Sequence, residues 1–205
     1  MPKLKLTYFD FDGGRGEPVR LALVIAGLPF EDDRVKFNEW AARKPGTPFG
    51  ALPVLQVDGA VISQSNTITR YVGKLTDLYP EDPWQAALCD EVMDAVEDLN
   101  GHIGSTISIG DPEAKKTARE ALAAGPMSVH LVRLNAYLES RGGEYFADNR
   151  LTVADLKVYS LVAHLRSGVL DHIPADLVDR KAPLLVKHAD RLLKHAKIAA
   201  YYKDR

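Results

Sequence analysis

Two polar residues, Gln64 and Ser65, stand where a helix should begin and where a small anion could bind. They lie within "LPVLQVDGAVISQSNTITRYV", residues 52–72, in which a strand pair runs straight into a helical pattern. One interpretation is that the Ser65 hydroxyl is an ordinary N-cap. The other starts from the partial positive charge and unpaired N–H groups of a helix N-terminus, which attract carboxylates. Gln64 favours the second, because it is not a preferred capping residue and its amide would face another polar group.

Tyr8 is a further candidate for chemistry, since it lies toward the end of the alternating segment "KLTYF". Open α/β folds bind ligands beyond the carboxyl ends of their strands, although a Tyr in such a strand is also a common half-buried core residue. Cys89 is the single cysteine, which permits neither an internal disulfide nor a Cys-x-x-Cys pair. Any thiol chemistry must therefore use a thiol from outside the chain.

The Leu52–Pro53 peptide bond opens a strand, where the missing N–H of proline breaks no ladder bond. If this bond is cis, the backbone of Leu52 turns outward and an extended peptide could pair with it as an added strand. A trans bond is the alternative and is much commoner for X-Pro bonds in general. Trp40 and Lys44 stand four residues apart and are, by themselves, consistent with a plain surface pair.

Residues 1–79 predict a first domain with the element order βαβ then ββα. Apolar residues alternate over 3–9, and "EPVRLALVIAGLPF" carries Pro18 near a helix start and a Gly-x-Pro sequence past its end. A second strand over 30–35 would lie parallel to the first. Asp58 and Gly59, between two apolar runs, predict a hairpin of antiparallel strands that leads into a helix from Ser65.

Residues 82–205 predict a second domain that is entirely helical, because strand alternation is not found there. Gly125 with Pro126 should kink one of its helices, and Thr152 should cap another with Asp155 reaching back. The expected helices cover residues 86–109, a kinked helix from "GDPEAKK" to near "SRGGEYF", one that begins after Thr152, and a last helix over 183–195.

The composition is that of a globular protein, with 46% hydrophobic and 26% charged residues and a net charge of -2. A nucleic-acid partner is not expected, because no run of Lys and Arg supplies the needed positive field. The N-terminus lacks the apolar core of a signal peptide and no apolar stretch is long enough to cross a bilayer, so we expect a cytoplasmic protein. The six His residues lack ligand spacing, so we expect no metal.

In this order of elements the chain resembles the soluble glutathione transferases. The resemblance covers nearly the whole length and is carried by "KLTYFDFDGGRGEPVRLAL", by residues 52–72 and by "LTVADLKVY". The "LTYF" start, the spacing of Trp40 and Lys44, and "PFG" before "LPVL" are most similar to the sigma-type branch. The resemblance implies a thioredoxin-like N-terminal domain that binds glutathione, a helical C-terminal domain, and a homodimer.

The resemblance also implies a role for each matching residue. Gln64 and Ser65 would hold the γ-glutamyl group, and Leu52 ahead of a cis Pro53 would pair with the cysteinyl unit. The remaining glutathione contacts implied are Trp40 and Lys44 at the glycine end, Arg15 in support of the site, and Asp98 reaching across from the partner subunit. Tyr8 matches the catalytic tyrosine, whose hydroxyl would donate to the glutathione sulfur and so favour the thiolate.

Several activities fit this resemblance. The thiolate would attack a hydrophobic electrophile or a peroxide oxygen, and related chains include prostaglandin isomerases. A non-catalytic glutathione-binding or structural protein of the same fold is another possibility, although the presence of Tyr8 speaks against it. A glutaredoxin-like exchange enzyme would need a cysteine in the first loop, "DFDGGRG", which has none.

The pocket for the second substrate is expected from Phe11 and Asp12 together with the small, polar helix positions Gly104, Ser105 and Ser108. The loop after Tyr8 departs from the family pattern in being one residue longer, and its glycines suggest a flexible corner rather than a phosphate loop. Phe49 lies where several branches insert an aromatic side chain into the partner subunit, with packing beneath the hairpin as the alternative. The C-terminal "AAYYKDR" would either close over the pocket or fray.

Overall fold

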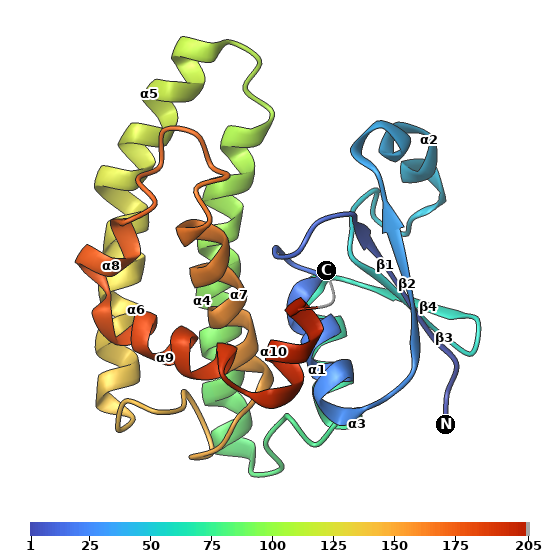
Figure 1. The fold of residues 1–205 in the computed structure, drawn as a ribbon. Helices are drawn as coiled ribbons and strands as arrows, with labels where there is room; N and C mark the ends of the chain where they lie inside the picture. The colour runs from blue at the N-terminus through green and yellow to red at the C-terminus, as the bar shows by residue number, and fades with distance from the viewer. Residues whose placement is uncertain (204–205) are drawn as a thin grey trace.

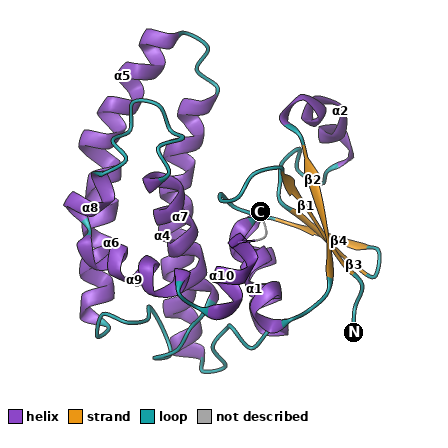
Figure 2. Cartoon of the chain, viewed as in Figure 1, coloured by secondary structure: helices purple, strands orange, loops and turns teal. Residues whose placement is uncertain are grey.

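The computed structural model describes residues 1–203, and Figure 1 shows a small sheet domain beside a larger helical domain. Helices and strands are segregated between them, and the only strands of the described chain lie in the first domain (Figure 2). This is the predicted class, a thioredoxin-like α/β domain followed by an all-α domain. The helix α3 ends at Leu75 and the next helix, α4, begins at Pro83.

The sheet has four strands in the order β2-β1-β3-β4. Their bounds are β1 Leu4–Phe9, β2 Phe30–Val35, β3 Val54–Val57 and β4 Ala60–Ser63. β1 pairs in parallel with β2 and antiparallel with β3, and β3 and β4 form the predicted hairpin. Asp58 and Gly59 both have positive φ, 51° and 89°, which is the backbone that a tight two-residue hairpin turn requires.

Two helices cover one face of the sheet, α1 Glu17–Ala26 and α3 Ser65–Leu75. Pro18 lies in the first turn of α1 and Gly27 ends it in a left-handed conformation, as the sequence predicted. Between β2 and β3 the chain forms three short helical turns, η1 Phe37–Glu39, α2 Trp40–Arg43 and η2 Lys44–Gly46. These turns stand away from α1 and α3, at the opposite side of the sheet (Figure 1).

The helical domain largely follows the predicted pattern. Its elements are α4 Pro83–Ile107, α5 Pro112–Leu122, the π-helical turn η3 Ala123–Met127, α6 Ser128–Ser140, α7 Val153–Arg166, α8 Leu177–Lys181, α9 Pro183–Leu193 and α10 Ala196–Lys203. The kink falls at Gly125, whose φ and ψ are non-helical, and the Thr152–Asp155 capping box is present. The prediction of a last helix to residue 195 was wrong, because α10 follows it; α8 was not predicted.

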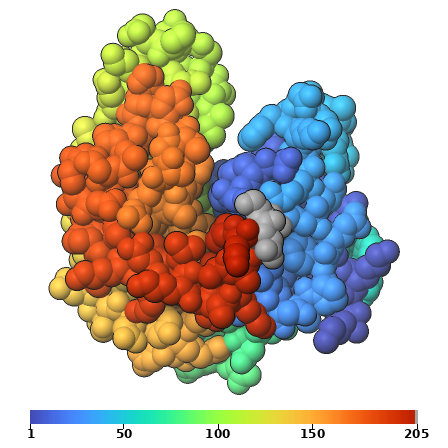
Figure 3. All heavy atoms as spheres, viewed as in Figure 1, coloured from blue at the N-terminus to red at the C-terminus, as the bar shows by residue number. Residues whose placement is uncertain are grey.

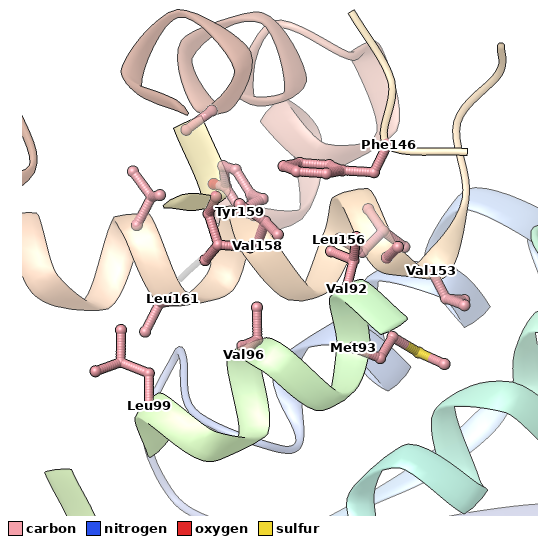
Figure 4. Packing of buried hydrophobic residues seen from close by; sticks show 14 of the residues in the cluster. Val92, Met93, Val96, Leu99, Phe146, Val153, Leu156, Val158, Tyr159 and Leu161 are labelled. Atoms are coloured by element: carbon pink, nitrogen blue, oxygen red, sulfur yellow. The ribbon is translucent and has the colours of Figure 1, made fainter. Parts of the chain in front are cut away.

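The helix α7 is buried between the two domains and packs against both. Residues 153–162 are all buried, and the helix packs against α4 and α9 on its own side and against α1 and α3 of the first domain. Val92 and Val96 of α4 point toward α7 in Figure 4. One continuous apolar cluster therefore runs from β1 through α7 to α9. None of the helices over residues 1–203 is long and apolar enough to cross a membrane.

Candidate active site

Tyr8 lies near the carboxyl end of β1 and is only 5% exposed. Its hydroxyl oxygen accepts a hydrogen bond of 2.9 Å from the backbone N–H of Arg15. Burial raises the pKa of Tyr8, against the lowering effects of the Arg15 N–H group and of the Arg15 and Arg20 cations. The phenol therefore keeps its proton at neutral pH, and this proton is available to an added acceptor.

The loop before α1 requires glycines because the Tyr8 side chain packs closely against the backbone of this loop. A Cβ atom on Gly16 would lie 2.5 Å from Cγ of the Tyr8 ring, and one on Gly14 would lie 2.6 Å from the Tyr8 hydroxyl. Gly14 also has a φ of 64°, a conformation that favours glycine. The glycine-rich corner thus has a steric cause, where the sequence had suggested flexibility.

Beneath Tyr8 the loop is held by Arg20, which sequence reasoning missed. The side chain is fully buried, and its guanidinium donates to the carbonyl oxygens of Phe9 and Phe11, at 3.2 and 2.9 Å, and to Glu17 and Asp32. Its guanidinium carbon also lies 5.6 Å from the centre of the Tyr8 ring. A charged residue on the buried face of "EPVRLAL" was the available signal.

A cavity of about 250 Å³ brings together five residues that the resemblance had named. They are Arg15, Leu52, Pro53, Gln64 and Ser65, joined by Phe49, Ala51, Ser63 and Glu97. The Leu52–Pro53 bond is cis, as the resemblance implied. We call this cavity the Gln64–Ser65 corner.

The start of α3 differs from the simple capping interpretation. Gln64 is the N-cap residue and Ser65 is already the first helical residue. The Ser65 hydroxyl donates instead to Oε2 of Glu97 on α4, at 2.9 Å. Gln64 has a φ of 73°, a sparsely populated conformation for a residue with a side chain. Such strained residues cluster at functional sites, and this one lines the cavity.

Glu97 is the acidic centre of the corner and was also missed. Its carboxylate contacts the guanidinium of Arg15 and lies 2.9 Å from Nζ of Lys157 on α7. Although burial by itself would raise the pKa of Glu97, the Lys157 and Arg15 cations lower it to about 2. Arg15 therefore links the two parts of the site, because its N–H group binds Tyr8 and its side chain binds Glu97.

Three other residues named from the sequence lie outside this corner. Trp40 lines a neighbouring cavity of about 390 Å³ that shares Leu52 with the corner, and its ring packs edge-on against Phe9 at 5.5 Å. Lys44 is exposed and lines neither cavity. Asp98 is exposed on α4, next in sequence to Glu97. Phe49 is 70% exposed, so packing beneath the hairpin is excluded for it.

A third, mostly apolar cavity of about 250 Å³ lies between the loop after β1, α7 and α10. Phe11 and Asp12 line it as expected, together with Tyr159, His164 and Tyr202 among others. Gly104, Ser105 and Ser108 do not line it. These three belong to the end of α4 and the turn after it, and the space-filling view in Figure 3 shows a cleft between the two domains at that end.

The C-terminal helix α10 is docked against the first domain. Tyr202 donates a hydrogen bond of 2.7 Å to Glu17, and Lys197 reaches the carbonyl oxygen of Ile25. Residues 199–203 of the "AAYYKDR" segment are therefore ordered against α1, while Asp204 and Arg205 lie outside the described residues. Within residues 1–203, no group of three or more His, Cys, Asp or Glu side chains is arranged to hold a metal ion.

Comparison with known proteins agrees with this architecture over the whole chain. Residues 4–74 match the model of the glutathione S-transferase N-terminal domain and residues 97–205 that of the C-terminal domain. Glutathione S-transferase 1 of Ascaris suum is 37% identical over 187 residues, which cover 88% of this chain and 89% of the relative. The hematopoietic prostaglandin D synthase of Gallus gallus is 32% identical, over 100% of this chain and 98% of the relative.

Solved structures give the same result. The prostaglandin synthase D of Nilaparvata lugens superimposes with a TM-score of 0.89 at 31% identity, covering 100% of this chain and 98% of that one. The chain belongs to the glutathione transferase family, in its sigma-like branch. It is a glutathione transferase with glutathione as co-substrate.

Proposed function

We propose that this enzyme conjugates glutathione to a hydrophobic electrophile, with Tyr8 as the residue that stabilises the thiolate. The observation that carries this proposal is the state of the Tyr8 phenol. The phenol is buried, it keeps its proton, and it receives the Arg15 N–H on its oxygen. A phenol that accepts one hydrogen bond becomes a better donor in the next, so its proton suits a sulfur anion.

The reaction then follows ordinary nucleophilic chemistry. A free thiol has a pKa of about 8.5, so only a few per cent is thiolate at neutral pH. The hydrogen bond from Tyr8 lowers the pKa of the bound thiol, whose proton goes to solvent. The sulfur forms a bond to the electrophilic carbon, and the bond to the leaving group breaks with its electron pair. A peroxide oxygen is an alternative electrophile, with the sulfur oxidised and the O–O bond reduced.

Glutathione binding is proposed at the Gln64–Ser65 corner and along Leu52. The γ-glutamyl group would meet Gln64 and Ser65, and Leu52, which lines the same cavity, would pair its main chain with the cysteinyl unit. Trp40 would contact the glycine end, because its cavity adjoins the corner at Leu52. Lys44 would pair with the glycine carboxylate, as the resemblance implies. Asp98 would act from the partner subunit of a homodimer, whose cytoplasmic location and detoxifying role are part of the same proposal.

The electrophile is proposed to bind in the apolar cavity beside Tyr8. The Phe11 ring lines this cavity and lies 5.7 Å from the Tyr8 ring between centres. Burial lowers the pKa of His164 there, so its imidazole is neutral at neutral pH and compatible with an uncharged ligand. Gly104, Ser105 and Ser108 would extend the pocket across the interdomain cleft.

The test is conjugation of a chloronitrobenzene by the wild-type protein and by Tyr8→Phe, together with titration of the bound thiol by its thiolate absorbance. With a shift of about two pKa units from Tyr8, the thiolate fraction at pH 7 falls from about three quarters to about 3% in the variant. Equal turnover and equal thiol pKa in the two proteins would remove Tyr8 from this role. Wild-type protein without turnover on any electrophile would contradict the transferase function.

A second candidate activity is a glutathione-dependent isomerase, favoured by the relatives of Gallus gallus and Nilaparvata lugens that are named for prostaglandin D synthesis. Isomerisation of a prostaglandin endoperoxide, measured beside conjugation and peroxide reduction, separates these activities. A non-catalytic glutathione-binding protein would bind glutathione and fail in all three assays.

A further inference from the structure

Lys157 is a buried cation directly behind the Gln64–Ser65 corner. It stands on α7, within the otherwise mostly apolar "VADLKVYSL", and its side chain is 2% exposed. Its ammonium group has three partners for its three protons. Nζ lies 2.9 Å from Oε2 of Glu97 and 3.4 Å from Oγ of Ser65, and it contacts Oδ1 of Asn66. A buried ammonium without such partners would be strongly destabilising.

The hydrogen bonds among Ser65, Glu97 and Lys157 indicate a role for Lys157 in ligand binding. The Ser65 hydroxyl has one proton, and it donates this proton to Oε2 of Glu97 at 2.9 Å. The same oxygen also receives Lys157. Glu97 therefore keeps a charged donor when the Ser65 hydroxyl turns toward a ligand in the cavity. Lys157 can at the same time donate to the Ser65 oxygen, which makes the hydroxyl a stronger donor.

The charge balance points the same way. The hydrogen-bonded cluster holds two cations, Arg15 and Lys157, and two anions, Glu97 and, through the amide of Asn66, Asp94, so its charges balance. Asp94 is exposed on α4 and its carboxylate binds the amide of Asn66, so it lies at the solvent side of this cluster. Without Lys157 the cluster would carry one net negative charge beside the cavity. Lys157 thus removes a repulsion that an added carboxylate would otherwise meet in the corner.

We propose that Lys157 is a positioning residue that makes the corner selective for a ligand with a free α-carboxylate on its γ-glutamyl unit. Its ammonium group keeps Glu97 hydrogen-bonded when the Ser65 hydroxyl turns away from Glu97. The Ser65 hydroxyl then donates to the ligand carboxylate. The inference rests on the proposed binding of glutathione in this corner. It adds a residue from the helical domain to the recognition of the γ-glutamyl end.

The experiment compares two ligands by calorimetry, S-hexylglutathione and its analogue in which 4-aminobutanoyl replaces the γ-glutamyl unit and so lacks the α-carboxylate. Lys157→Met should weaken binding of S-hexylglutathione about tenfold, as expected for a lost hydrogen bond to a charged group. Binding of the analogue should change less than about twofold. With glutathione as substrate, KM should rise while kcat stays within about twofold. Lys116→Met, an exposed lysine on α5, is the matched control and should change neither affinity.

Two further variants keep the test decisive. Lys157→Gln retains an amide donor without the charge and should show the same discrimination between ligands, even if Lys157→Met is too unstable to purify. In a Ser65→Ala background, substitution of Lys157 should not weaken the binding of S-hexylglutathione further, because the effect of Lys157 acts through the Ser65 hydroxyl. Equal losses for both ligands, or no loss for either, would overturn the inference. Wild-type protein that binds S-hexylglutathione without turnover would overturn only the transferase function, whereas absence of binding would overturn both.

Discussion

The hydroxyl of Tyr202 donates a hydrogen bond of 2.7 Å to the buried carboxylate of Glu17, and this bond ties the last described helix to the first helix of the chain. Tyr202 also lines the apolar cavity beside the loop after β1. The helix α10 is thus part of the proposed electrophile pocket and is held there by a specific contact.

Tyr202→Phe removes only that hydroxyl. We expect the docking of α10 to weaken by about 1 kcal/mol, because a carboxylate loses one donor while the ring packing remains. Amide hydrogen exchange over residues 196–203 should accelerate, and the KM of an apolar electrophile should rise. The exposed Tyr71→Phe is the control and should leave both quantities unchanged. Unaltered exchange in Tyr202→Phe would show that the contact does not hold the helix.

Gly16→Ala should destabilise the fold, because its new Cβ would overlap the Tyr8 ring at 2.5 Å from Cγ. We expect a loss of about 1–3 kcal/mol in the free energy of unfolding, the usual range for overpacking. Gly101→Ala, within α4 and without any atom within 4 Å of the added Cβ, should instead stabilise by up to about 1 kcal/mol. Urea denaturation measures both, and similar values for the two variants would contradict the steric explanation.

The lowered pKa of Glu97 predicts a definite pH dependence. Its folded pKa of about 2 lies below the ordinary value of 4.5 for a glutamate, so the ionised carboxylate stabilises the folded state above pH 4.5. This contribution is lost as the pH falls toward 2. Glu97→Gln should therefore be less stable than wild type at pH 7, by about 1–2 kcal/mol once solvent screening is allowed for.

The comparison of these two proteins is made by urea denaturation at a series of pH values. Their difference should shrink between pH 4.5 and 2, because protonated Glu97 then resembles Gln. A difference that is constant with pH would show that the charge of Glu97 makes no contribution.

Phe49 offers a test of the homodimer. A side chain that is 70% exposed while lining the Gln64–Ser65 corner is suited to insertion into a partner. Phe49→Ala should raise the dimer dissociation constant at least about tenfold, as for a central aromatic anchor. Light scattering across a dilution series measures this, with Trp84→Ala as a control because Trp84 is exposed to a similar degree. Identical dilution curves for wild type and Phe49→Ala would exclude Phe49 from the interface.

Local patterns predicted the parts of the fold and site that depend on short-range structure. Asp58–Gly59 specified the hairpin and Thr152 with Asp155 specified the start of α7, because turns and caps are set by neighbouring residues. Leu52 and Pro53 likewise line one cavity with Gln64 and Ser65, because these two pairs lie at the open end of one hairpin. The cis bond at Pro53 was expected only from the family resemblance.

The unpredicted parts depend on how distant helices pack. Glu97 and Lys157 meet Ser65 across three helices, and no spacing within the sequence encodes that contact. Their only signal was a charge inside an apolar helical pattern, as for Arg20. Gly104, Ser105 and Ser108 were expected in the second-substrate pocket from family position, but the apolar cavity that Phe11 and Asp12 line lies between the loop after β1, α7 and α10. The helix α10 was missed because the pattern was taken to end at residue 195.

The meeting of α3, α4 and α7 at Ser65, Glu97 and Lys157 has a consequence for folding. A glutathione analogue bound in that corner would stabilise the association of the two domains, since each domain contributes residues to the cluster around the ligand. Saturation at a hundred times the dissociation constant would add about 2.7 kcal/mol to the cooperative unit by mass action alone. Residues 1–79 produced alone would not receive this stabilisation from the ligand, because they contain Ser65 but neither Glu97 nor Lys157.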